Sequence, residues 1–163
     1  GAKDPEAREK MHNASCLAGM AFNQASLGIN HSIAHVLGGK FHIPHGRTNS
    51  ILLPHVIEYN SSIVGYTNTT YSATAKKYAQ IAELVGLGSA NIRISVRNLV
   101  NEIKKLQKEM NMPTKLTQCK LSLEDITNEE REIAKLAIKD TCTLTNPKVP
   151  TEDDIINILK NIK

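Results

Sequence analysis

The sequence predicts an all-α fold, a helical bundle, and two observations support that prediction. Apolar residues recur at steps of three and four along most of the chain, which is typical of helices with one buried face. No segment has the features of a convincing strand. At 163 residues the chain is long enough to bury a core, so residues 1–163 are expected to form a single helical domain.

Capping residues and glycines divide the chain into the expected helices. Asp4 and Pro5 suit a helix start, because Asp accepts bonds from free backbone N–H groups and Pro fits the first turn. Gly28 should end or bend that helix, Asn30 should cap the next one, and the glycines at 38 and 39 should stop it. Residues 40–47 are expected to form a loop. The later helices are expected at residues 49–59 with an interruption at Pro54, 69–85, 90–110, 128–138 behind Thr127, and from a cap at Thr151 onward.

The clearest of these helices covers residues 90–110. Its apolar residues fall on one face and its lysines fall outside that face. The residues expected to be buried are Ile92, Val96, Leu99, Ile103 and Leu106, and those expected to be exposed are Lys104, Lys105 and Lys108. Pro113 should terminate the segment.

Several classes of protein fit the sequence poorly. No segment approaches the roughly 20 apolar residues that would span a bilayer, so no membrane partner is expected. No charged leader followed by an apolar stretch opens the chain, which favours a cytoplasmic setting. Cys16, Cys119 and Cys142 form an odd, widely spaced set, which indicates neither a disulfide framework nor a thiolate metal cage.

The net charge of +4 raises the question of nucleic acid binding. Residues 67–120 carry nine basic and three acidic groups, whereas residues 121–163 carry six and nine. Nucleic acid platforms interleave basic with aromatic residues, and this chain has only two Phe, four Tyr and no Trp. We therefore expect no nucleic acid partner. The alternative to an enzyme is a helical module that uses its basic middle for nucleic acid or an acidic partner.

The histidines are concentrated in one stretch of the chain. Four of the six, His31, His35, His42 and His45, fall within fifteen residues. Two histidines four apart share one face of a helix, with Cβ atoms about 5–6 Å apart, and neutral imidazole is the commonest metal ligand. A loop with Pro44 and Gly46 could bring His45 back over that helix.

Spacing alone leaves the role of these histidines open. A pair such as His31 with His35 is often surface polarity or a satisfied core contact. The pair also lacks the Glu of HExxH, so it is not the zinc-protease signature. His12, His42 and His55 are interpreted as structural.

A longer run carries a resemblance to a known family. Residues 20–46, MAFNQASLGINHSIAHVLGGKFHIPHG, resemble the iron-containing (group III) alcohol dehydrogenases, whose pattern is HxxxH followed by a PHG loop. His31, His35 and His45 keep that family's spacing of four and then ten. The resemblance extends to residues 7–13 and 49–56 and to Asn146–Pro147, so it covers essentially the whole chain.

This resemblance implies the helical C-terminal domain of a two-domain enzyme that interconverts alcohols and aldehydes or ketones. It implies Fe(II), or Zn in some members, and NAD or NADP held mainly by an N-terminal domain that is missing here. The implied partners are a small alcohol or aldehyde, the chain's own N-terminal domain and, for the full-length protein, further copies in a homo-oligomer.

The resemblance also assigns site residues. His31 and His45 match two of the family's metal ligands, and His35 matches a histidine near the nicotinamide and the alcohol oxygen, where it would carry a proton. That makes His35 the expected catalytic and cofactor-contacting residue. Phe22 matches a position that lines the substrate pocket, and Leu27 should lie close to it; the alternative is that both are plain core residues.

Two parts of the family pattern are absent. The other two ligands belong to an Asp-x-x-x-His pair, and no Asp of this chain has a His four residues on. No glycine-rich turn follows a strand, as a dinucleotide site requires. We therefore expect the chain alone to bind metal poorly and to lack dehydrogenase activity. A domain of the same fold whose metal role has lapsed is a further alternative.

Overall fold

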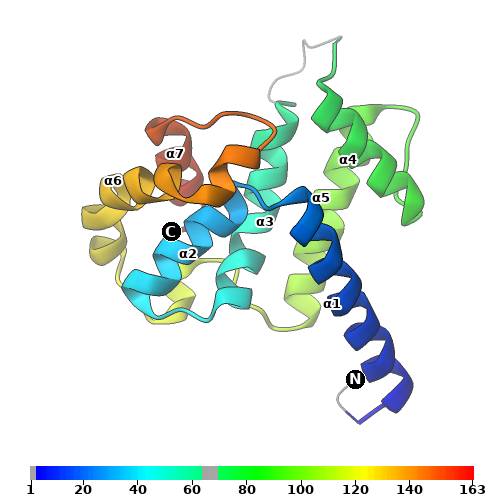
Figure 1. Ribbon diagram of the computed structural model, residues 1–163, viewed down its shortest axis with the longest axis horizontal. Helices are drawn as coiled ribbons and strands as arrows, with labels where there is room; N and C mark the ends of the chain where they lie inside the picture. The colour runs from blue at the N-terminus through cyan, green and yellow to red at the C-terminus, as the bar shows by residue number, and fades with distance from the viewer. Residues whose placement is uncertain (1–2, 64–69) are drawn as a thin grey trace.

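A computed structural model describes residues 3–63 and 70–163 and confirms the all-α class, because the described residues contain helices and no strand. Figure 1 shows their arrangement. No helix in these two ranges is both long and apolar enough to cross a membrane. The helices in chain order are α1 (Pro5–Ala25), α2 (Ile29–Phe41), α3 (His45–Ser61), α4 (Ala73–Leu84), α5 (Ile92–Glu109), the short 3-10 helix η1 (Leu116–Cys119), α6 (Leu123–Lys139), the short 3-10 helix η2 (Thr141–Thr145) and α7 (Glu152–Ile162).

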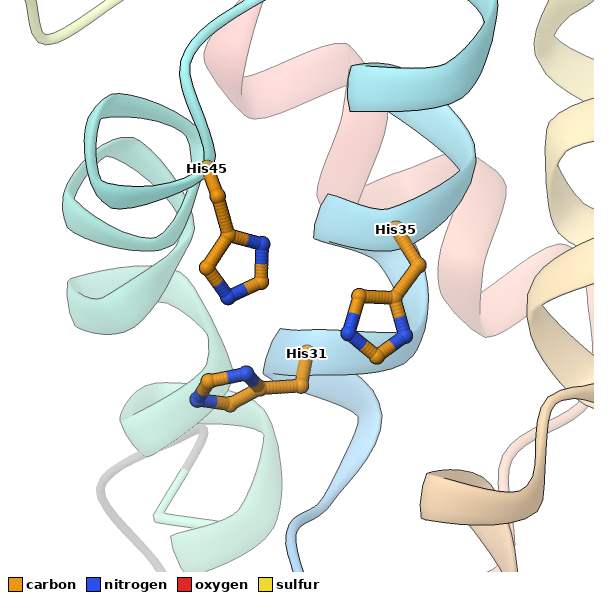
Figure 2. A group of neighbouring side chains, drawn as sticks. All are labelled: His31, His35 and His45. Atoms are coloured by element: carbon orange, nitrogen blue, oxygen red, sulfur yellow. The ribbon is translucent and has the colours of Figure 1, made fainter. Parts of the chain in front are cut away.

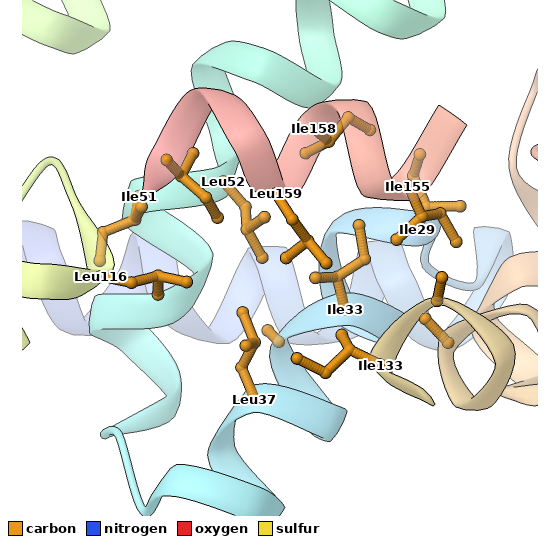
Figure 3. Close-up of a cluster of buried hydrophobic side chains, with 14 of the residues drawn as sticks. Ile29, Ile33, Leu37, Ile51, Leu52, Leu116, Ile133, Ile155, Ile158 and Leu159 are labelled. Atoms are coloured by element: carbon orange, nitrogen blue, oxygen red, sulfur yellow. The ribbon is translucent and has the colours of Figure 1, made fainter. Parts of the chain in front are cut away.

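Helix α2 supplies the centre of the main core. Ile29, Ile33 and Leu37 recur every four residues on one face, and none of the three is exposed to solvent. They meet apolar side chains from α3, α6 and α7, as Figure 3 shows. Burying an aliphatic side chain of this size contributes about 1.5–3 kcal/mol to the free energy of folding. Burial of this face therefore fixes how α2 is rotated about its own axis.

Helix α1 lies outside this core. It projects from the rest of the domain in Figure 1, and none of its residues is buried. Its cap is the predicted one, since the Asp4 carboxylate accepts from the backbone N–H groups of Glu6 and Ala7. Its apolar side chains face solvent, with exposed fractions of 70% for Met11 and 47% for Phe22.

The predicted limits of α2 are wrong. Residues 31–37 lie within a longer helix that continues through Gly38 and Gly39 to Phe41. The capping residue His42 adopts φ 54° and donates its N–H to the Gly38 carbonyl. Glycine inside a helix costs about 1 kcal/mol relative to alanine, and burial of Leu37 on the same helix offsets that cost. Gly28, and not Asn30, occupies the capping position.

Helix α3 also differs from its prediction. It begins at His45 and not at Asn49, and it continues through Pro54 without a break. Proline has no backbone N–H, so a proline inside a helix leaves the carbonyl four residues earlier without a hydrogen-bond donor. For Pro54 this is the carbonyl of Ser50. The buried Gln107 side chain on α5 donates to that carbonyl at 2.5 Å. A contact from a distant helix thus satisfies the carbonyl that Pro54 cannot.

Of the remaining helix predictions, some are confirmed and others are wrong at the start of the helix. Helices α5 and α7 lie where they were expected, with caps at Asn91 and Thr151. On α5, Val96 is buried as predicted, whereas Leu106 is 45% exposed. Helix α6 begins five residues before the expected start, because Ser122 and not Thr127 caps it. The expected start of α4 at Thr69 lies outside the described residues, and α4 begins at Ala73.

The start of α2 is tied to the end of α3 by one buried amide. Asn146 Oδ1 accepts from the Ile29 N–H at 3.3 Å and from Asn60 Nδ2 at 3.2 Å. Asn146 Nδ2 contacts Asn60 Oδ1 at 2.8 Å and the Lys148 carbonyl at 2.6 Å. Both polar atoms of this side chain are therefore hydrogen-bonded, and the bond to Oδ1 fixes where α2 begins.

Gly28→Ala should destabilise the domain by about 1–3 kcal/mol, because the new Cβ would lie 2.7 Å from Asn146 Oδ1. The oxygen cannot withdraw without losing the bonds that hold it. Gly19→Ala is the matched control: no atom lies within 4 Å of its added Cβ, and alanine should stabilise the exposed helix α1 by about 1 kcal/mol. Urea denaturation of both variants measures the difference, and equal effects would contradict the account.

Candidate metal and catalytic centre

Three imidazoles converge between α2 and α3. His31 and His35 come from α2 and His45 is the first residue of α3. Figure 2 shows the three rings facing a common space. The ring centroids of His31 and His45 are 5.1 Å apart, and those of His35 and His45 are 5.3 Å apart. One ligand atom from each ring lies within 4.8 Å of the others, a spacing at which they can share one ion.

Local structure accounts for this convergence. The four-residue spacing places His31 and His35 one turn apart, on the side of α2 away from the buried face that carries Ile33. The turn after α2 is only three residues long and includes His42 in the left-handed conformation. Pro44 then precedes α3, so His45 is turned back toward α2. The structure thus brings together the three histidines that the sequence singled out.

His35 has a partner that the sequence did not indicate. Its Nδ1 lies 2.9 Å from Oδ2 of Asp140, which follows α6. The other carboxylate oxygen, Oδ1, accepts from the Cys142 backbone N–H at 2.8 Å. Asp140 lies 105 residues from His35 along the chain, and no spacing rule connects positions so far apart.

His45 is held by an amide. Asn49, one turn further along α3, donates through Nδ2 to Nε2 of His45 at 2.8 Å and to its carbonyl at 3.1 Å. Asn30 on α2 in turn donates through Nδ2 to Asn49 Oδ1 at 2.7 Å. Asn30, expected to be a helix cap, instead links α2 to the residue that orients His45. Its own Oδ1 is buried without a hydrogen-bond partner among the described residues.

The electrostatics favour a neutral His31 and an ionised Asp140. Burial lowers the pKa of His31, and the neighbouring His45 and His35 lower it further, while Asp140 acts in the opposite direction. Burial of Asp140 would raise its pKa, but hydrogen bonds from His35 and Cys142 outweigh that effect and lower it. Neutral imidazoles offer lone pairs, which is the state that metal binding requires.

The donor set fits a divalent cation. Imidazole nitrogen suits both iron and zinc, and His31 and His45 present two such donors. His35 is engaged with Asp140 through one nitrogen and keeps the other. A second group, His35 with Asp140 and Cys142, also has donor atoms within 4.8 Å of one another. Burial and the Asp140 carboxylate raise the pKa of the Cys142 thiol, so this sulfur is the weaker candidate.

The two residues expected near the substrate lie on the approach to α2. Phe22 sits near the end of α1 and is half exposed. Leu27 is half-buried between α1 and α2, and its carbonyl accepts from the Thr145 hydroxyl. Neither belongs to the histidine cluster itself. Their role toward a substrate stays a prediction.

One hollow of the described surface lies away from the histidines. A cavity of 730 Å³ lies between α4 and α5 and is lined by residues such as Lys76, Glu83 and Ser95. Its lining contains no histidine or cysteine. Convergent chemistry, and not size, therefore identifies the candidate site.

Comparison with known proteins points to one family. Residues 1–163 match the model of the Fe-containing alcohol dehydrogenase family, C-terminal part. An NADPH-dependent butanol dehydrogenase of Clostridium saccharobutylicum is 41% identical over 96% of this chain and 38% of its own length. A 1-propanol dehydrogenase of Salmonella typhimurium is 36% identical over 95% of this chain and 40% of its own length.

Solved structures agree with the sequence relatives. A 1,3-propanediol oxidoreductase matches 99% of this chain and 39% of its own with a TM-score of 0.83 and 33% identity. An alcohol dehydrogenase from Oenococcus oeni matches 97% of this chain and 38% of its own with a TM-score of 0.80 and 30% identity. The chain thus spans about two fifths of the length of these relatives.

His45→Ala should raise the pKa of His31. The substitution removes a neighbour that lowers this pKa when charged, and it opens the ring of His31 to solvent. NMR titration of the ring protons of His31 in the metal-free chain measures the shift. His12→Ala is the control, because His12 lies on exposed α1 and should leave His31 unchanged. An unchanged or lower pKa in His45→Ala would contradict the described cluster.

Proposed function

Since this chain belongs to the Fe-containing alcohol dehydrogenase family, we propose that it forms the helical C-terminal domain of an enzyme that interconverts alcohols and aldehydes or ketones. NAD or NADP would serve as the hydride carrier. The observation that carries the proposal is the convergence of His31, His35 and His45 in one cluster. Because the chain spans about two fifths of its relatives' length, we place cofactor binding mainly in the remainder of the protein.

His31 and His45 would hold the cation, which we take to be Fe(II) or Zn. Two imidazoles make an open site, so further ligands must come from outside this chain. When bound, such a cation supplies positive charge that favours the alkoxide form of an alcohol and polarises a carbonyl in the reverse direction. Asn49 donates to Nε2 of His45 in the metal-free chain, so a cation bound at His45 would displace either this amide N–H or the proton on Nδ1.

His35 would carry the proton. Imidazole accepts and releases protons near neutral pH, and this ring is 42% exposed at the edge of the cluster. In alcohol oxidation a ring nitrogen of His35 would accept the hydroxyl proton, and a bound nicotinamide would serve as the hydride acceptor. In aldehyde reduction the same nitrogen would return the proton to the substrate oxygen. The ring lies beside His31 and His45, where the substrate oxygen would sit.

The exposed apolar side chains of α1 support a partner for this domain. Met11, Leu17 and Met20 are each at least 64% exposed, and Phe22 lies on the same helix. We propose that the N-terminal domain of the same protein covers this helix. Phe22 and Leu27 would then border the substrate space and help to exclude water. Homo-oligomer formation by the complete protein stays a prediction.

In the complete dehydrogenase, His31→Ala and His45→Ala should each lower metal affinity by tenfold or more, because loss of a partner that only orients a ligand already costs about 10–100-fold. His35→Ala should keep the metal and lower kcat by about 10²–10⁴-fold, as expected for a lost acid–base group. Metal analysis and aldehyde reduction measure both effects, and His12→Ala, which removes a histidine outside the cluster, is the control. Full metal content in His31→Ala and His45→Ala would contradict the ligand assignment.

The chain of 163 residues on its own should bind Fe(II) or Co(II) weakly and show no alcohol dehydrogenase activity. The physical reason is that two imidazole ligands leave most of the coordination shell to water. Titration with Co(II), followed by its visible absorption, measures the affinity, and NADH or NADPH consumption with an aldehyde measures turnover. Turnover by the isolated chain would overturn this expectation.

A further inference from the structure

The carboxylate of Asp140 has two oxygens with separate partners. Oδ1 accepts a hydrogen bond from the Cys142 N–H at 2.8 Å, and this bond caps η2. Oδ1 also lies 3.4 Å from the Ser32 hydroxyl. Ser32 is fully buried on α2, and its hydroxyl is 2.8 Å from that of Thr143. The carboxyl group is therefore fixed by both α2 and η2. Oδ2 is left to face Nδ1 of His35 at 2.9 Å.

This contact determines where the proton of a neutral His35 must be. The hydrogen bonds from His35 and Cys142 outweigh the effect of burial and lower the pKa of Asp140, so the carboxylate is ionised at neutral pH. An ionised carboxylate can only accept a hydrogen bond, so the proton must sit on Nδ1 of His35. The lone pair of the neutral ring is then on Nε2.

We propose that Asp140 is a positioning residue that fixes the ring orientation and tautomer of His35, so that Nε2 is free to accept a proton from the substrate. The proposal rests on the proposed function of His35 as proton carrier. The bond that breaks is the substrate O–H, and the bond that forms is Nε2–H. The resulting imidazolium keeps Asp140 as its counter-ion, and the reverse reaction returns the proton from Nε2.

A purely structural role for Asp140 is the competing explanation, because its Oδ1 also caps η2. Asp140→Asn separates the two roles. Asparagine caps a helix as well as aspartate does, so η2 should persist. Its NH₂ group can face Nδ1 of His35, and this contact would favour the tautomer with the proton on Nε2, which cannot accept another proton. Asp140→Glu keeps a carboxylate and should recover part of the activity.

The test measures kcat, KM and metal content in the complete dehydrogenase. Asp140→Asn should lower kcat by about 10–100-fold, as losses of such supporting partners do, with little change in KM and with metal retained. Asp125→Asn is the matched control, because Asp125 forms the capping box of α6 with the cap residue Ser122 and is not part of the histidine cluster. It should leave kcat unchanged.

A double-mutant cycle with His35→Ala tests whether Asp140 acts through His35. In the His35→Ala background, Asp140→Asn should change kcat less than about twofold, since the residue through which it acts is gone. A full Asp140→Asn effect in that background would overturn the proposal, as would a wild-type kcat in Asp140→Asn.

A tautomer measurement separates failure of this inference from failure of the proposed function. NMR of the zinc-loaded enzyme, labelled at the histidine ring nitrogens, should show Nε2 of His35 unprotonated in the wild type and protonated in Asp140→Asn. The same tautomer in both proteins would overturn the positioning role. If His35→Ala retained full kcat, the proton-carrier function would fail, and the NMR result would still decide whether Asp140 orients the ring.

Discussion

The site depends on the burial of one face of α2. Ile29, Ile33 and Leu37 enter the core completely, and this fixes how the helix is rotated about its axis. The direction in which His31 and His35 point is then also fixed, because they occupy the other side of the same helix. The hydrogen bond from the Ile29 N–H to Asn146 fixes where α2 begins. Both the rotation and the position of two imidazoles thus follow from packing outside the site.

The close approach of three imidazoles creates an electrostatic constraint of its own. Protonated rings at centroid distances of 5–6 Å would repel, and burial of His31 adds to the cost of charging it. Each of the other two rings has a hydrogen-bonding side chain: Asn49 donates to His45, and Asp140 pairs with His35. The rings of His35 and His45 thereby have different hydrogen-bond partners, and our proposal assigns them different roles.

Features of this chain that depend on local chemistry were predictable from the sequence, whereas features that depend on distant contacts were not. The start of α7 follows from its own cap, so it was predictable from the sequence. The break expected at Pro54 is absent because Gln107, on another helix, satisfies the carbonyl that proline leaves free. The same division holds at the site. Four-residue spacing was enough to pair His31 with His35. The contact between Asp140 and His35 was not predictable from a local sequence pattern, because the two residues lie 105 positions apart.

X-ray absorption spectroscopy and anomalous diffraction at the iron edge, applied to the complete iron-loaded dehydrogenase, test the central claim most directly. The account predicts one ion with nitrogens of His31 and His45 at about 2.0–2.2 Å, a distance typical of imidazole–metal bonds. It also predicts His35 outside the coordination shell and paired with Asp140. An ion bonded to His35, or an ion away from His31 and His45, would contradict the division of roles.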